Sequence, residues 1–237
     1  MSDGTGSGSD RHTASAFDQD LGELRGLIAE MGGLAEIALD NARIALVQRD
    51  STLAAQVVED DRQIDALEAR IGQHIINLIV RRAPMADDLR EVLAAHRIAG
   101  IIERVGDYSK TIAKRVPLLG SVPVAEPMQM LLDLLGVVRE MLKSALNAFA
   151  ARDPAMAQAV CRRDRDIDEL YNRLFLALLA YMMNEPANIS ATAHLMFIAK
   201  SLERVGDQAT NLAELVYFTA SGEQLPDRHG PNPVVSG

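Results

Sequence analysis

The sequence contains an internal repeat, which constrains its fold more than any other feature. Residues 48–65 align without a gap with residues 151–168, at an offset of 103, and share eight of eighteen residues. A second pair of segments, 101–116 and 201–216, aligns at an offset of 100 with seven identities in sixteen positions. A tandem duplication of a unit of about a hundred residues explains both offsets.

The distribution of prolines and helix-forming residues predicts an all-α protein. Long stretches without proline are rich in Ala, Leu, Ile, Arg and Glu, and no sustained alternation typical of strands appears. Six helices are expected, over residues 16–48, 51–81, 87–116, 126–151, 154–183 and 188–220. Because short loops join them, they should pack as two tandem antiparallel three-helix bundles.

The repeat and the composition of the chain ends together predict the domain organisation. The first repeat should span residues 16–120 and the second residues 121–222. Residues 1–15 are dominated by Ser, Gly, Asp and Thr, and residues 223–237 contain three prolines. Neither end has enough apolar surface to order itself, so both are expected to be flexible tails.

Charge and hydropathy exclude several classes of protein. The chain carries 24 basic and 33 acidic residues, a formal charge of −9, which disfavours nucleic-acid binding. The longest apolar run, Leu174 to Met183, has ten residues and is too short to span a membrane, and no signal-peptide pattern begins the chain. A lone Cys161 fits a reducing compartment. We therefore expect a cytoplasmic protein.

Apolar spacing and capping residues define the helix faces and ends. In the second helix, the apolar seam is predicted at Leu53, Val57, Ile64, Leu67, Ile71 and Leu78. Asp60 and His74 would occupy its two missing positions. Asp153 before Pro154 is a predicted N-cap, and Asn188 or Ser190 could cap the last helix.

Acidic pairs with i, i+4 spacing recur at matched positions of the two units. They are Asp61 with Asp65, Glu103 with Asp107, Asp164 with Asp168 and Glu203 with Asp207. Each pair lies on one face of its helix and off the apolar seam, so the acids should face outward or flank the core. Residues 65 and 103, like residues 61 and 107, are equidistant from Pro84, and their counterparts are equidistant from the Glu185-Pro186 turn. This register brings four carboxylates to one level in each unit.

Four carboxylates at one level repel one another unless a positive charge neutralises them. Oxygen ligands in this number are typical of a site for a hard metal ion. The alternative is a solvated face in which the acids pair with arginines, namely Arg62, Arg104, Arg165 and Arg204. The fourfold recurrence at matched heights favours the metal interpretation.

Other candidate motifs have structural interpretations. No Glu-x-x-His sequence occurs, so a ferritin-like di-iron site is not expected. His74 and His96 have no counterpart in the other unit, and we interpret His96 as a structural or surface residue. A single glycine in mid-helix cannot cradle phosphate, so Gly106 and Gly206 are predicted to allow close approach of helices.

Three features of the sequence resemble the PhoU family of phosphate-transport accessory and signalling proteins. They are the segment Leu202–Glu214, with its Glu-Arg-Val-Gly-Asp core, the turn Pro84–Arg90, and the Asp-x-x-x-Asp pairs. The resemblance covers about residues 16–222 and implies two three-helix bundles related by a pseudo-twofold axis. It also implies multinuclear clusters of iron or another divalent or trivalent metal on the eight acidic residues named above. Two departures, Thr111 opposite Asn211 and residues 188–190 opposite residues 88–90, predict that the two sites differ in occupancy.

The resemblance implies a function as well. A PhoU-like protein would be a negative regulator of the phosphate-starvation response and of phosphate uptake. It would connect the phosphate ABC transporter ATPase to the sensor histidine kinase, recruited peripherally to the membrane, and we expect a homodimer. No catalytic constellation appears in the sequence, so an adaptor is favoured over an enzyme. The alternatives are a carboxylate-bridged metal-dependent hydrolase or oxidase, and a structural bundle without ions.

Overall fold

A computed structural model of the chain describes residues 7–120 and 125–225. Within these residues the protein is helical and contains no strand. The elements are α1 (Ser7–Gln48), α2 (Ser51–Arg82), α3 (Asp87–Arg115), the 3₁₀ turn η1 (Val116–Leu119), α4 (Ala125–Ala151), α5 (Pro154–Arg162), α6 (Asp164–Asn184), the 3₁₀ turn η2 (Pro186–Asn188) and α7 (Ile189–Ser221). The predicted all-α class is confirmed.

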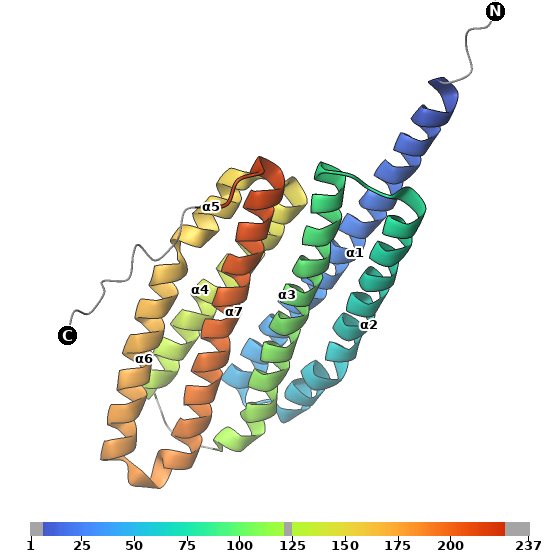
Figure 1. The fold of residues 1–237 in the computed structure, drawn as a ribbon. Coiled ribbons are helices and arrows are strands. Elements are labelled where there is room, and N and C mark those ends of the chain that lie inside the picture. Colours follow the sequence, from blue (N-terminus) through green and yellow to red (C-terminus); the bar gives the residue numbers. More distant parts are fainter. Residues whose placement is uncertain (1–6, 121–124, 226–237) are drawn as a thin grey trace, which may run out of the picture.

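The helices form two three-helix bundles that lie side by side (Figure 1). Helices α1, α2 and α3 pack on one another in the first bundle, and α4, the α5–α6 pair and α7 do so in the second. The two bundles meet where α3 packs against α7 and α1 against α4. The predicted tandem architecture is therefore confirmed, with α3 and α7 at its centre.

Two helices differ from their predicted extents. The fifth predicted helix is divided at Arg163, where Arg163 N donates to Val160 O at 3.0 Å and Asp166 N donates to Arg163 O at 3.1 Å. These i to i−3 bonds replace the α-helical pattern for one turn, so α5 and α6 are separate helices. The first helix begins at Ser7 and not near residue 16.

The predicted tails lie mostly outside the described residues. Residues 1–6 and 226–237 are not described, and residues 7–15 belong to α1. Residues 223–225, after the end of α7, have no regular secondary structure.

The same Arg-Asp turn begins the second helix of each repeat. Arg49 and Arg152 both adopt a left-handed backbone, with φ of 56° and 52°. Asp50 Oδ1 then accepts from the backbone N–H groups of residues 52 and 53, and Asp153 Oδ1 accepts from those of residues 155 and 156. The predicted cap at Asp153 is confirmed, because each aspartate satisfies two free N–H groups of the first turn.

The predicted cap of the last helix is wrong. Asn188 occupies the N-cap position of α7 but makes no side-chain capping bond. Its Nδ2 donates to the Tyr181 hydroxyl at 3.0 Å instead, because η2 brings the asparagine back over the end of α6.

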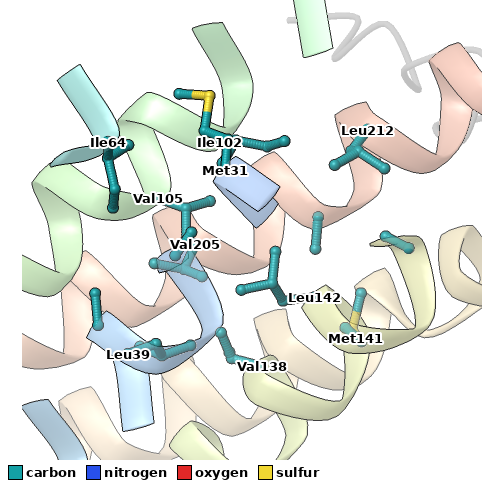
Figure 2. Close-up of a cluster of buried hydrophobic side chains, with 14 of the residues drawn as sticks. Met31, Leu39, Ile64, Ile102, Val105, Val138, Met141, Leu142, Val205 and Leu212 are labelled. Atoms are coloured by element: carbon teal, nitrogen blue, oxygen red, sulfur yellow. The ribbon is translucent and has the colours of Figure 1, made fainter. Parts of the chain in front are cut away.

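The two bundles share one hydrophobic core. Figure 2 shows buried side chains of both bundles meeting at the contact between them, with Val105 of α3 and Val205 of α7 near the centre. Met31 and Leu39 from α1 and Leu142 from α4 lie around these valines. The buried cluster continues from one repeat into the other, so the two bundles are joined by a common apolar core.

Candidate metal centres

The first acidic cluster lies between α2 and α3, where Asp61 and Asp107 face one ammonium group. Lys110 Nζ donates to Asp61 Oδ2 at 2.5 Å and to Asp107 Oδ1 at 3.0 Å. The hydrogen bonds to Asp61 and then to Asp107 raise the pKa of the Lys110 ammonium above its ordinary value. Asp61 and Asp107 are thus brought together across the helix pair, as the register around Pro84 predicts.

Asp61 is a core residue, which corrects the expectation that the acids lie off the seam. Its exposed fraction is 3%. The buried residues of α2 include Val57, Asp61 and Ile64, so Asp61 and not Asp60 continues the spacing of the seam. Asp60 lies nearer the surface, where it accepts from Gln56 Nε2 at 2.7 Å. A carboxylate buried this deeply requires a compensating charge, and Lys110 supplies it.

The outer part of the first cluster gathers around Glu103. The pKa of Glu103 is raised to about 7, chiefly by burial and then by the negative charges of Asp107, Glu68 and Asp65. A hydrogen bond between the Glu103 and Asp107 side chains acts in the same direction. Glu68, which the register does not include, therefore joins Asp65, Glu103 and Asp107 in the outer part of the cluster.

The second cluster, between α6 and α7, contains the four acids expected there. The pKa of Asp207 is raised to about 6, chiefly by burial and then by the negative charges of Glu203, Asp164 and Asp168, against a smaller lowering by Lys200. Lys200 Nζ lies 2.7 Å from Glu203 Oε2, and the lysine side chain is 44% exposed, that of Glu203 14%.

Thr210 completes the second cluster from the inner side. Its hydroxyl lies 2.9 Å from Asp164 Oδ1 and 3.1 Å from Gly206 O. Thr210 occupies the position that corresponds to Lys110 at the offset of 100. The inner carboxylate of the second cluster therefore faces a neutral hydroxyl where that of the first faces an ammonium.

Both clusters have the type of ligand that a hard cation prefers, but the ligands are not arranged around a single metal position. In the described part of the chain, no group of three or more His, Cys, Asp or Glu side chains is placed so that it could hold a metal ion as it stands. The donors are all carboxylates, the ligands that such ions prefer. The raised pKa values of Glu103 and Asp207 show the mutual repulsion that a bound cation would relieve.

Three residues of the clusters were not predicted from the sequence, namely Glu68, Lys110 and Lys200. The hairpin register contains a signal for each of them. Residue 110 is level with residue 58, one turn from Asp61, and residue 68 is level with residue 100, one turn from Glu103. Residue 200 is level with Tyr171, and Lys200 Nζ does lie over the Tyr171 ring, 5.3 Å from its centroid. Extending the register from acids to all charged residues would have found them.

Two lysines contact the clusters, Lys110 in the first and Lys200 in the second. Arg62 instead contacts Glu59 on its own helix. Among the histidines, His74 Nε2 lies 3.0 Å from the carbonyl oxygen of Asp20, a structural contact with α1.

The two mid-helix glycines allow the helices that bear the clusters to approach closely, as predicted. A Cβ atom at Gly106 would lie 2.9 Å from Ile64 Cδ1 and 3.1 Å from Asp61 Oδ1. At Gly206 it would lie 2.4 Å from Ile167 Cδ1. Both separations are shorter than a normal contact, so a side chain at either position would have to displace the tip of Ile64 or Ile167.

A polar groove of about 880 Å³ adjoins the first cluster. It lies between α3 and α7, and both Glu68 and Glu103 belong to its wall. His96, Arg97 and Arg104 line it as well. Spacing along the chain does not predict this groove, because the groove forms between helices of different repeats.

Comparison with known proteins identifies relatives along nearly the whole chain. The model of the PhoU domain family matches residues 28–116 and 131–216, one match in each repeat. The phosphate-specific transport system accessory protein PhoU homolog of Zymomonas mobilis is 53% identical over 217 residues, which cover 92% of both chains. The homolog of the same name from Rhizobium meliloti is 44% identical and covers 90% of both chains.

Solved structures share the fold. The crystal structure of PhoU from Pseudomonas aeruginosa superposes with a TM-score of 0.84 at 34% identity and covers 87% of this chain and 100% of that one. The phosphate transport system regulatory protein PhoU from Streptococcus pneumoniae gives a TM-score of 0.82 at 26% identity, covering 89% and 99% of the two chains. Among the described residues, no helix has the length and apolar character needed to cross a membrane.

Proposed function

The chain belongs to the PhoU family, and from this premise we propose that it serves phosphate-specific transport as a negative regulator. It restrains phosphate uptake and keeps the phosphate-starvation response off when phosphate is abundant. It acts in the cytoplasm by contact, as an adaptor between the ATPase of the phosphate ABC transporter and the sensor histidine kinase. It reaches the membrane peripherally through these partners and functions as a homodimer.

The observation that carries the adaptor proposal is a pair of exposed apolar stripes at equivalent positions of the two repeats. Ile76 and Val80 form the α2 stripe, and Leu179 and Met183 form the α6 stripe; all four side chains are exposed. Each residue of the first stripe lies 103 positions before its counterpart. Residues four apart share a helix face, so each stripe presents a continuous apolar surface.

The surroundings of the stripes favour protein partners. Residues 174–184 of α6 include no charged side chain, although this helix surface faces solvent in part. Single exposed apolar residues are ordinary, whereas apolar surface recurring on both halves indicates contact with another molecule. Two equivalent stripes allow one chain to engage two partners, as an adaptor must.

We propose that the two acidic clusters hold metal ions, iron or another divalent or trivalent cation. The first site would use Asp61, Asp65, Glu103 and Asp107, and the second Asp164, Asp168, Glu203 and Asp207. The carboxylate donors and the repulsion among them support this proposal. A bound cation would neutralise the clusters and fix α2 to α3 and α6 to α7.

A metal-dependent hydrolase or oxidase is the second candidate function. The groove beside Glu68 and Glu103 favours it, because this groove could admit a small substrate next to a metal site. The relatives are named as accessory proteins of phosphate transport, which favours an accessory role, and we propose that this chain catalyses no reaction.

Gene deletion tests the regulatory function. Deleting the gene should leave phosphate-starvation genes expressed in phosphate-rich medium, and removing the sensor kinase as well should silence them. Normal repression in the deletion strain would contradict the proposal. Turnover of a phosphoester by the purified protein, abolished by changing Asp61 or Asp164, would establish the enzyme instead.

Surface substitutions test the adaptor contacts. Ile76→Glu and Met183→Glu should each weaken capture of the transporter ATPase or the kinase cytoplasmic domain by about tenfold or more, since they place a charge in an apolar contact. Ile37→Glu is the matched control, because Ile37 and Ile76 have the same exposed fraction, 56%, but Ile37 lies on α1. Equal effects of the two isoleucine changes would show that the stripes are not the contact surface.

A further inference from the structure

The two acidic clusters differ most at one pair of equivalent positions, Lys110 and Thr210. Lys110 lies between the carboxylates of Asp61 and Asp107, at 2.5 and 3.0 Å, and joins α2 to α3. Only 25% of its side chain is exposed, and that of Asp61 is 4% exposed. The ammonium therefore lies among the inner carboxylates of the first cluster, where a metal ion would have to bind.

The second cluster has no ammonium at the equivalent position. The Thr210 hydroxyl bonds to Asp164 there, and it carries no charge. The ammonium of this cluster, Lys200, contacts Glu203 from the rim, and 44% of its side chain is exposed. Gly100 occupies the position that corresponds to Lys200 in the first repeat. Each cluster thus has a lysine, but Lys110 contacts two carboxylates on two helices, whereas the ion pair of Lys200 is with Glu203 of its own helix.

We propose that Lys110 acts as a cation of the protein itself that occupies the inner position of the first cluster, so that a metal ion must displace its ammonium there, whereas the equivalent position of the second cluster is the neutral hydroxyl of Thr210. This inference rests on the proposed metal binding of the two clusters. Its chemical basis is competition, because an ammonium and a hard metal ion use the same carboxylate oxygens.

Competition with Lys110 should weaken the binding of a metal ion at the first cluster. Displacing Lys110 breaks two charge-assisted hydrogen bonds, and the loss of even one such bond corresponds to roughly tenfold to a hundredfold in affinity. The second cluster should therefore fill at a lower metal concentration than the first. The protein then has a half-loaded state, in which the second repeat is fixed by metal and the first by its own lysine.

Exchanging the two residues tests the inference. Lys110→Thr should raise the affinity of the first cluster at least about tenfold, because the competing ammonium is gone. Thr210→Lys should lower the affinity of the second cluster to a similar degree. Lys114→Thr is the matched control, since it removes the same charge from an exposed position one turn along α3. Lys110→Arg keeps a cation and should keep the first cluster weak.

The measurement is binding of Mn²⁺ alone to the full chain after treatment with chelator, by equilibrium dialysis with elemental analysis. Asp107→Asn and Asp207→Asn assign the two binding steps to the first and second clusters. The expected result for the unchanged protein is a tight step lost in Asp207→Asn and a weak step lost in Asp107→Asn. The weak step should become tight in Lys110→Thr and remain unchanged in Lys114→Thr.

The possible outcomes separate this inference from the metal binding on which it rests. Equal affinities of the two clusters, or an unchanged weak step in Lys110→Thr, would overturn the role of Lys110 while metal binding stands. Absence of Mn²⁺ binding in every variant would overturn both.

Circular dichroism shows whether Lys110→Thr folds. If it folds only when Mn²⁺ is added, the metal has replaced the ammonium and the inference is supported. If it fails to fold with or without Mn²⁺, Lys110 is a permanent structural cation and the inference is wrong.

Discussion

Glu103 shows how the packing of one carboxyl group determines the pH response of the first cluster. Its pKa rises from an ordinary 4.5 to about 7, first because burial removes water and then because Asp107, Glu68 and Asp65 repel its charge. The folded chain therefore binds the Glu103 proton more tightly than the unfolded chain does. Between these two pKa values the folded state holds more protons, so its free energy of unfolding must fall as the pH rises.

We predict that the chelator-treated protein loses stability from about pH 4.5 to about pH 7, and that Glu103→Gln removes much of this loss. The amide is neutral at every pH and cannot repel its neighbours. Urea unfolding at several pH values measures the slope, and Glu30→Gln, at an exposed position of α1, is the control that should keep it. A slope that is the same in Glu103→Gln and in the unchanged protein would contradict the prediction.

A second residue-scale prediction concerns the aspartate caps. Asp153→Ala should reduce the free energy of unfolding by about 0.5 to 2 kcal/mol, because two backbone N–H groups of α5 lose their acceptor. Ser190→Ala is the control, since the start of α7 has no side-chain cap to lose. Chemical denaturation compares them, and equal losses would show that the Asp153 bonds contribute nothing.

At the scale of helices, the clusters depend on how closely their two helices approach. Gly106 lets the backbone of α3 approach Ile64 and Asp61 of α2, and Gly206 plays the same part opposite Ile167. A wider separation would move Asp61 away from Lys110, because the lysine side chain extends from α3. The distance between helices thus decides whether the buried carboxylate keeps its counter-charge.

We predict opposite effects for two glycine-to-alanine changes in α3. Gly106→Ala should destabilise the protein by about 1 to 3 kcal/mol, because its methyl group would overlap Ile64 Cδ1. Gly100→Ala should stabilise it by about 0.5 to 1 kcal/mol, because alanine favours the helix and the nearest atom, Glu68 Oε1, is 4.0 Å away. Thermal or urea unfolding gives both values, and a neutral Gly106→Ala would show that the helices can separate without cost.

At the scale of the whole molecule, the repeats are joined by a common core. Val105 and Val205 are buried between the bundles, with side chains of α1 and α4 around them (Figure 2). Cutting the chain between the repeats would expose this apolar surface on both halves.

We predict that a fragment ending at Gly120 is not a stable monomer. The surface of α3 that packs on α7 would be exposed, so the fragment should self-associate or unfold. Co-expression with a fragment that begins at Ala125 should restore a one-to-one complex. Light scattering and circular dichroism decide between these states. A monomeric first fragment that melts cooperatively at the temperature of the full chain would contradict the shared core.

The sequence alone determined the features that depend on local spacing. The repeat offsets, the helix periodicity and the cap at Asp153 follow from neighbours within a few residues, and the structure confirms the two bundles. The equal distances of Asp61 and Asp107 from Pro84 likewise predicted that they would meet, because an antiparallel hairpin fixes its own register. Identification of the family needed no more than the motifs that the repeat makes visible.

Only the tertiary structure decided which charges lie inside. Asp61 is buried and Asp60 is not, although both are acids within one turn, because the rotation of α2 against its neighbours selects one of them. Lys110 reaches that carboxylate across the gap that Gly106 keeps narrow. Which acidic residue is buried depends on the distances between helices that are far apart in the chain. The spacing of residues along one helix does not determine those distances.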